Sequence, residues 1–452
     1  MKRIKARDQQ TNNPNIRSLS HSCVCVNAFS LHHRDFVAYN HSAVKIVVVF
    51  CSFRLALSGV VIYNSSKSLI SIRLKRSGGK SVPETVVMLV SCGKRKSTKP
   101  CQAKEMYNSS RFQCLKSIAE QFGLEWYILS AKYGLLSPNE VIEPYDLSLA
   151  MCPLEEQISW AVRTANQLLK ADNDTAFFIV ADALYSQHIV PMLHDAGHSV
   201  SAPFLDQNEV GLASYVERAT HLNDIRRLYD LLFYLSDSTG GVRRICDCNG
   251  KMYWPQRGVY FVVDFGEQNL ILHGRPRIVR IGTHAVSRDS KSTLWNRIKT
   301  HKGTDSGSGN HRGSIFRLHV GNAIIKQQGI ICNTWGVGQN ASKAVRSEEI
   351  ELEKQVSKYI GNLGIIVLDV DDEPSANSIR SFVEKNSISL LSSINSSFNF
   401  PMIDWLGNYS NREEIRKSAL WNINYVNSTY DESLLDVVER HVAISVQNYK
   451  KG

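Results

Sequence analysis

The order of apolar and polar segments in the C-terminal half is the feature that most constrains the fold of this chain. Three short apolar segments have the pattern of strands, and two longer segments have the spacing of helices. In chain order they are strand 258–264, strand 277–282, helix 292–301, strand 364–370 and helix 375–391. Ser292 or Thr293 is placed to cap the first helix. We therefore expect a small antiparallel sheet flanked by helices, an α+β arrangement.

Four polar residues are distributed over these elements. Tyr260 lies on the first strand, Arg297 and His301 lie on the first helix, and Glu384 lies on the last helix. Because Arg297 and His301 are four residues apart, they share one face of their helix. Together these residues supply what phosphodiester hydrolysis requires, namely a proton acceptor for water, a cation for the charge on phosphorus and a metal-binding carboxylate.

The chemistry suggests a role for each residue. The Glu384 carboxylate is a hard oxygen ligand suited to one Mg²⁺ or Mn²⁺, and Arg297 offers a planar, permanently charged donor fork. Either Tyr260 or His301 could take the proton of water, and histidine has the more convenient intrinsic pKa. Each residue also has a structural alternative: a core aromatic for Tyr260, a solvated helix face for Arg297 and His301, and a surface carboxylate for Glu384.

The C-terminal half resembles a GIY-YIG nuclease domain. Gly258-Val259-Tyr260 stands for the first half of the motif, and Arg280-Ile281-Gly282 stands for the second half with Arg280 in place of the usual tyrosine. The resemblance implies that Tyr260 acts directly with His301 in support, that Arg297 is the catalytic arginine, and that Glu384 binds the metal. A nearby Arg280 would contact substrate and favour the phenolate form of Tyr260.

Further residues of this half are candidates for substrate binding. His311 and Arg312 follow a glycine-rich loop, where they could contact phosphate or simply belong to a flexible surface loop. Asn386 lies on the same predicted helix as Glu384. Residues 404–407 and 418–422 resemble features of one bacterial branch of such proteins.

Residues 85–237 predict a separate α/β domain with a mostly parallel sheet. Short apolar strands at 85–91, 125–130 and 175–180 alternate with helical patterns at 112–123, 154–170 and 182–194. Ligands of such sheets collect beyond the carboxyl ends of the strands. Lys94, in the basic turn 91–96 after the first strand, and Lys132, after the second strand, are therefore candidate substrate contacts; a solvated basic turn is the alternative.

This domain resembles a bacterial family without an assigned activity that is related to the amino-terminal domain of archaeosine synthase. The resemblance rests on segments 91–96, 106–112, 129–135 and 141–147. It implies a three-layer fold like that of uracil-DNA glycosylases and suggests contact with a nucleobase or nucleic acid. Ser130, Lys132, Tyr145 and Asp146 form a polar pocket or brace a loop.

The net charge of +11 gives no argument for nucleic-acid binding by the folded domains. Residues 1–83 hold 13 Lys and Arg against Asp8 and Asp35, which leaves 40 charges of each sign in the rest. We expect residues 1–84 to be a poorly ordered basic extension, with Met88 as an alternative start. The apolar run 43–63 has the length of a membrane span, but Arg54 near its middle costs about 2.5–3.5 kcal/mol there, so no membrane contact is expected.

The ten scattered cysteines favour a reducing, cytoplasmic environment. They form no C-x-x-C pair, so a zinc ribbon cannot be built locally. Cys246 and Cys248 form a C-x-C pair that is only a weak metal-binding signal.

We expect residues 238–254 to be a linker and residues 255–452 to be the second domain. Two hypotheses for the function of the chain remain. The first is a Mg²⁺-dependent endonuclease acting on DNA, with the N-terminal α/β domain for substrate recognition. The second is a non-catalytic nucleic-acid-binding protein with a degenerate nuclease site.

Overall fold

The computed structural model describes residues 85–172, 174–272 and 275–451, together with the backbone of five earlier strands. These are β1 (Phe29–Leu31), β2 (Arg34–His41), β3 (Val44–Phe50), β4 (Val60–Tyr63) and β5 (Leu69–Ile72). They lie in a unit that is separate from residues 80–452, and they pair antiparallel as β1-β2-β3 and β4-β5. The expectation of poor order over 1–84 otherwise falls outside the described residues. Among the described residues, no helix is both long and apolar enough to cross a membrane.

The first domain of the larger unit is built on a five-stranded sheet. Its strands are β6 (Thr85–Ser91), β8 (Glu125–Ser130), β9 (Gly134–Leu136), β11 (Thr175–Val180) and β12 (Ser199–Ser201). They are arranged in the order β12-β11-β6-β8-β9, with only β9 antiparallel to its neighbour. Strands β6 and β11 are almost entirely buried apolar runs, as expected for central strands covered on both faces. The predicted parallel sheet is confirmed.

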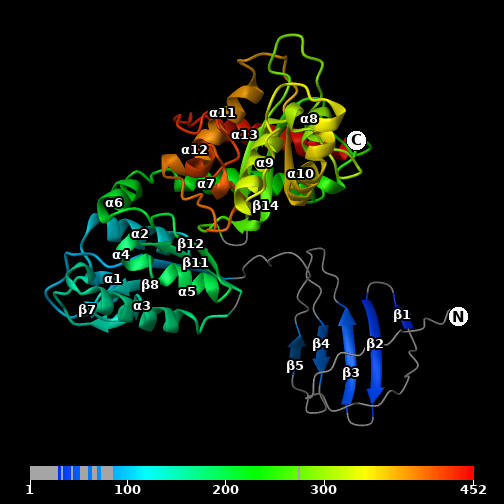
Figure 1. Ribbon diagram of the computed structural model, residues 1–452. Coiled ribbons are helices and arrows are strands. Elements are labelled where there is room, and N and C mark those ends of the chain that lie inside the picture. Colours follow the sequence, from blue (N-terminus) through cyan, green and yellow to red (C-terminus); the bar gives the residue numbers. More distant parts are fainter. Residues whose placement is uncertain are drawn as a thin grey trace. The chain divides into compact units, whose positions relative to one another are not determined.

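Helices cover both faces of this sheet and make three layers. They are α1 (Ala103–Met106), α2 (Ser110–Gln121), α3 (Leu154–Leu168), α4 (Ala183–Ser186), α5 (Ile189–Asp195) and α6 (Glu209–Glu217). Figure 1 shows α2 and α6 above the sheet and α3 and α5 below it. Two further short strands, β7 (Cys101–Gln102) and β10 (Val141–Ile142), pair with each other in a separate antiparallel sheet.

The second domain contains a four-stranded antiparallel sheet. Its strands are β13 (Arg243–Arg244), β14 (Gly258–Gln268), β15 (Pro276–Gly282) and β16 (Gly364–Asp369), in the order β13-β16-β14-β15. On the central strand β14, Tyr260 is paired with Gly282 of β15 and with Val367 of β16. The α+β class predicted for this half is confirmed.

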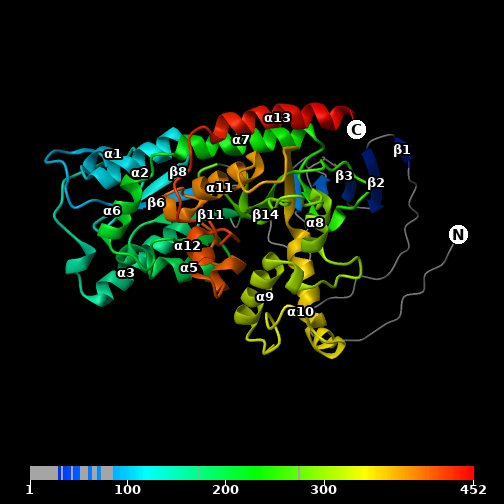
Figure 2. The same cartoon turned by 90° about the horizontal axis from the view of Figure 1, so that it is seen from above.

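Side chains of β14 alternate between two apolar layers, as the pleat of a strand requires. Val259, Phe261 and Val263 enter the layer that joins the first domain, and Tyr260 and Val262 enter the opposite layer. The first layer is covered by α7 (Leu222–Ser238), α11 (Ile379–Leu391) and α13 (Leu434–Lys451), and the second by α8 (Leu294–Lys302), α9 (Ile315–Gln328) and α10 (Lys343–Asn362). Figure 2 shows α7 and α13 side by side.

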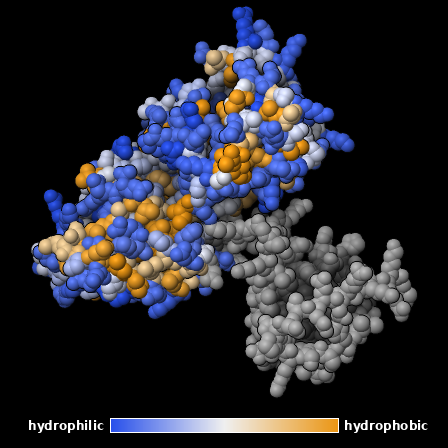
Figure 3. Space-filling view, viewed as in Figure 1, coloured by the Kyte–Doolittle hydropathy of each residue, from blue (hydrophilic) through white to orange (hydrophobic). Residues whose placement is uncertain are grey.

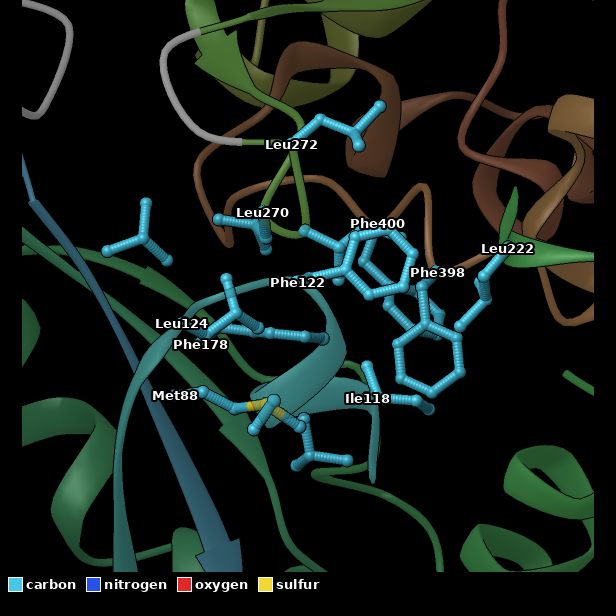
Figure 4. Packing of buried hydrophobic residues seen from close by; sticks show 14 of the residues in the cluster. Met88, Ile118, Phe122, Leu124, Phe178, Leu222, Leu270, Leu272, Phe398 and Phe400 are labelled. Atoms are coloured by element: carbon cyan, nitrogen blue, oxygen red, sulfur yellow. The ribbon is translucent and has the colours of Figure 1, made fainter. Parts of the chain in front are cut away.

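The segment expected to be a linker is part of the second domain. Within 238–254, β13 pairs with β16 and extends the sheet. Helix α7, assigned from sequence to the first domain, packs against α13 and β16. Phe178 of β11 also stacks edge-on with Phe398, at 6.2 Å between ring centroids, so the two domains share a continuous core (Figure 4). The short β13 and the helix α7 carry no strong boundary signal in the sequence.

The segment 419–422 covers the outer edge of β15. The Trp421 backbone N–H donates to Val279 O at 2.7 Å. The Asn422 side chain accepts from Ile281 N–H at 3.1 Å and donates to Ile281 O at 2.8 Å. This segment, which follows α12 (Glu413–Ser418), therefore holds β15 in place beside the candidate site.

An apolar stripe remains exposed on the outer side of α3 and the turn before it. Met151, Leu154, Ile158 and Val162 lie on successive turns, and Met151 is 82% exposed. Figure 3 shows apolar patches amid hydrophilic residues on both domains in this view.

Candidate active site

Two glycines allow the strands of the second domain to meet closely around Tyr260. A Cβ atom on Gly258 would lie 2.4 Å from Leu368 O on the neighbouring strand. A Cβ atom on Gly282 would lie 2.2 Å from the Tyr260 hydroxyl oxygen. Both positions therefore require glycine, which explains the glycine of each tripeptide by packing alone.

Tyr260 is linked to the helix α8 by a buried hydrogen bond. Its hydroxyl oxygen lies 2.9 Å from His301 Nε2, and His301 Nδ1 lies 2.7 Å from Ser314 Oγ. All three side chains are buried. Thr293 caps α8 by accepting the Asn296 backbone N–H, so one of the two predicted caps is the one used. Tyr260 and His301 were both expected at the site, but neither their hydrogen bond nor the contribution of Ser314 to this hydrogen-bonded chain was predicted.

Ser314 Oγ accepts the Arg317 backbone N–H at 3.2 Å and so caps α9. When Ser314 also donates its hydroxyl proton to His301 Nδ1, the ring proton lies on Nε2 and is directed at the Tyr260 oxygen. In the other tautomer, Tyr260 donates to His301 Nε2 and His301 Nδ1 donates to Ser314 Oγ. The position of a serine immediately before a helical pattern is the signal from which Ser314 could have been found.

The His301 ring is held neutral. Burial lowers its pKa well below the usual value, and the nearby cations Arg280, Arg297 and Arg317 lower it further. A charged imidazolium here would be desolvated and repelled by three guanidinium groups. His301 is therefore a hydrogen-bonding partner of Tyr260 and a weak base.

Glu384 and Arg297 lie at the same end of the sheet as this chain. Burial raises the pKa of the Glu384 carboxyl, while Arg280, the backbone N–H of Thr283 and Arg297 act to lower it. Both Glu384 and Arg297 are half-buried. The structure thus brings a carboxylate and two guanidinium groups together just beyond the carboxyl end of β15.

Arg297 has no ion pair within 4 Å among the residues that the structure describes, and its buried Nε atom has no hydrogen-bond partner there. The Arg297 guanidinium is therefore not neutralised by an ion pair within the described residues. Arg280, at the position of the second tyrosine, is partly committed. Its Nη1 donates to Trp421 O at 2.5 Å and its guanidinium lies 4.8 Å from the centre of the Phe316 ring.

Two buried histidines that the sequence did not single out flank these residues. Burial and Arg280 lower the pKa of His319 to about 4, and neither ring nitrogen has a partner within the described residues. Burial and Arg380 lower the pKa of His284 to about 4, and its Nδ1 lies 3.1 Å from Ser292 O. A lone histidine in an apolar helical pattern, as at 319, gives no signal in sequence.

His311 and Arg312, expected to contact phosphate, instead fix the loop before α9. His311 Nδ1 lies 3.0 Å from Glu353 Oε1, and its Nε2 accepts the Gly336 backbone N–H. Arg312 makes a buried two-pronged ion pair with Glu349, at 2.6 and 2.8 Å. The acidic partners lie on α10, whose pairing with this loop is not visible in sequence.

The remaining candidates also lie away from Tyr260 and Arg297. Asn386 is buried; it donates to Phe382 O and accepts the Asp431 backbone N–H, so it joins two segments of chain. Lys94 and Lys132 are exposed on the first domain. Lys94 pairs with Glu209 at 3.1 Å, and Lys132 lies 4.8 Å from the centre of the Tyr133 ring.

The residues present fit a metal held by one protein carboxylate. No group of three or more His, Cys, Asp or Glu side chains suited to a metal occurs among the described residues, which excludes a preformed protein cage there. Mg²⁺ commonly binds through one or two carboxylates and takes its remaining ligands from water and substrate phosphate. Glu384, half-buried and without an ion pair within 4 Å in the described part of the chain, matches that mode.

Comparison with known families agrees with this architecture. Residues 87–211 match a family of unknown function, DUF6884, and residues 219–448 match the GIY-YIG domain. The second match begins just before α7, in agreement with the packing of that helix. No curated protein and no solved structure matches the chain. The GIY-YIG match covers half of the sequence and contains both tripeptides and the residues around them. The chain therefore belongs to the GIY-YIG family, whose domain is a nuclease domain.

Proposed function

We propose that this protein is a Mg²⁺-dependent endonuclease that hydrolyses phosphodiester bonds of DNA, and that its first domain contacts the substrate. The observation that carries the proposal is the grouping of Glu384, Arg297 and the Tyr260–His301 pair at one end of the second sheet. A carboxylate, an uncommitted guanidinium and a hydrogen-bonded phenol are the groups that the reaction needs.

In the proposed reaction, water attacks phosphorus, and the bond between phosphorus and the leaving oxygen breaks. Tyr260, as the phenolate, takes the proton of the attacking water, and the neutral His301 donates Nε2–H to the phenol oxygen. Arg297 donates to the phosphate oxygens, where negative charge accumulates. The Tyr260 hydroxyl is covered in this structure, and catalytic contacts of this kind often form fully only with substrate bound.

Glu384 would hold the metal ion, which supplies Lewis-acid stabilisation of the phosphate and the leaving oxygen. The ionised carboxylate is required for this, since a proton competes with the metal for the same oxygens. Arg280 and the Thr283 N–H help to keep the carboxylate ionised despite its burial.

We expect Glu384→Gln to abolish Mg²⁺-dependent nicking of supercoiled DNA, because an amide binds Mg²⁺ poorly. Glutamine preserves the size of the side chain and an oxygen to accept the Thr283 N–H, so the variant should fold. Wild-type protein without activity in Mg²⁺, or a glutamine variant with unchanged activity, would count against the proposal. Binding of DNA without nicking by the wild-type protein would favour the non-catalytic alternative, to which Arg280 at the second tyrosine position gives some support.

The same carboxyl predicts a pH dependence of stability. Because the pKa of Glu384 is raised in the folded protein, its contribution to stability is present below the unfolded value of about 4.3 and is lost as the pH rises through the folded value. Bound Mg²⁺ offsets that loss. The increase of Tm caused by Mg²⁺ should therefore grow with pH across this range in wild-type protein and be absent in Glu384→Gln, as measured by differential scanning calorimetry.

Replacing Ser314 by alanine should slow cleavage more than its effect on stability explains. The variant loses the cap of α9 and also the partner of His301 Nδ1, so the Nε2–H is no longer held toward Tyr260. We expect a lower cleavage rate. Ser342→Ala is the matched control, because Ser342 caps α10 in the same way but does not contact His301. Loss of the cap should cost each variant about 1 kcal/mol of stability, and Ser314→Ala should lose more because a buried nitrogen of His301 is left without a partner. Equal cleavage rates in the two variants would remove Ser314 from the chain.

A further inference from the structure

The first domain contains a cavity at a place where α/β sheets commonly bind ligands. The chain leaves β6 for β8 on one side of it and later returns to β11 on the other side. These diverging connections leave a crevice beyond the carboxyl ends of β6 and β11. A cavity of about 650 Å³ lies there, within the range of small-molecule sites. Its lining includes Cys92, Lys94, Leu147, Asp182, Tyr185 and Leu205.

Asp182 gives this cavity a buried acceptor. The residue is 8% exposed, and its Oδ1 accepts the Leu184 backbone N–H at 3.1 Å, which caps α4. Burial raises the pKa of Asp182, and the nearby Arg111 opposes the shift only in part. The Arg111 guanidinium is committed to Ser91 Oγ at 2.7 Å and Cys92 O at 2.9 Å. Asp182 has no ion pair within 4 Å in residues 85–172, 174–272 and 275–451, so it favours a ligand with N–H donors.

The walls and the rim of the cavity differ in character. Leu147, Leu184 and Leu205 supply apolar surface, which suits a planar group. At the rim, Lys94 is paired at 3.1 Å with Glu209 on α6, and the Lys94 side chain is 80% exposed. An exposed pair of this kind is weak. Lys94 can therefore exchange Glu209 for an anionic group of a ligand.

We propose that this cavity binds one nucleotide extruded from a nucleic-acid strand, with the base inside against Asp182 and its phosphate beside Lys94. A nucleotide combines the three features that the cavity complements: planar apolar faces, an edge with N–H donors, and a phosphate. The inference rests on the proposed function for the strand as the source of the nucleotide. Removing a base from the stack costs a few kcal/mol, which is lowest where the base is already unpaired.

The test measures binding by the full-length protein in EDTA, where cleavage is blocked. Isothermal titration with the four deoxynucleoside monophosphates should show at least one binding at one site. Asp182→Asn, which keeps the oxygen that caps α4, should weaken that binding about tenfold or more. The control Asp172→Asn changes an exposed residue just before β11, at the opposite end of the sheet, and should have no effect. Lys94→Ala should weaken binding of the monophosphate but not of the matching nucleoside.

The source of the nucleotide is tested with a labelled duplex that carries one unpaired nucleotide, compared with the same duplex carrying an abasic residue there. We expect tighter binding of the unpaired nucleotide in wild type, and loss of that preference in Asp182→Asn. Absence of nucleotide binding, equal binding of inorganic phosphate, or no preference between the duplexes would overturn the proposal. Nucleotide binding that depends on Asp182 in a protein that does not nick DNA would sustain the cavity and reject only the nuclease.

Discussion

Arg297→Ala lowers the single-turnover rate of DNA cleavage by about 10³-fold and leaves the fold intact. A guanidinium that neutralises charge in a phosphoryl transition state is typically worth this much or more. The fold should not suffer, because no hydrogen bond or ion pair of the described residues depends on the Arg297 side chain beyond its electrostatic influence on Glu384 and its neighbours.

The control for this variant is Lys299→Ala, which removes a positive charge from an exposed position on the same helix. It should change cleavage little at moderate ionic strength, because exposed charges are screened. Rates are measured with protein in excess over labelled duplex, and folding is followed by circular dichroism. Equal rates for the two variants would remove Arg297 from the reaction, and unfolding of Arg297→Ala alone would show that the fold depends on this side chain.

Gly282→Ala costs about 1–3 kcal/mol of stability and most of the cleavage activity. The added methyl would lie 2.2 Å from the Tyr260 hydroxyl oxygen and 2.4 Å from the ring carbon that carries it. The ring is buried in the layer that α8, α9 and α10 cover, so it can make room for the methyl only by shifting away from its 2.9 Å contact with His301. Stability and activity should therefore fall together.

Gly313→Ala is the matched control, because a Cβ atom there would meet only Thr300 Cγ2 at an ordinary 3.6 Å. Urea unfolding should give similar m-values for all three proteins, with a lower midpoint only for Gly282→Ala. A stable and fully active Gly282→Ala would show that the strands do not hold Tyr260 as tightly as the structure indicates.

Local pattern was sufficient for most elements of the two sheets. The apolar runs of β6 and β14 both appear in the sequence as they do in the structure. By contrast, α7 was assigned to the wrong neighbour. Its apolar face shows that it packs, but whether it packs on the first or the second sheet depends on contacts with α13, about 200 residues later. Such partner choice is a tertiary property.

The candidate site was likewise predicted only in part. The sequence order and the family resemblance placed Tyr260, Arg297, His301 and Glu384 on the elements where the structure has them. His311 was expected to face a phosphate, yet it is fixed by Glu353 of α10, because the long-range ion pairs of this loop have no local signature. Ser314 was missed for the opposite reason. Its local role as a helix cap is readable, but its contact with His301 needs the packing of α8 against α9.

The central claim is that Glu384 and Arg297 act on one phosphate. It is tested most directly by a crystal structure of the protein with a nuclease-resistant phosphorothioate duplex and Mn²⁺, in which anomalous scattering locates the metal. We expect one Mn²⁺ at about 2.1–2.2 Å from a Glu384 carboxylate oxygen, with the Arg297 guanidinium donating to the phosphate that shares this metal. A metal bound away from Glu384, or a backbone phosphate that reaches neither residue, would contradict the account.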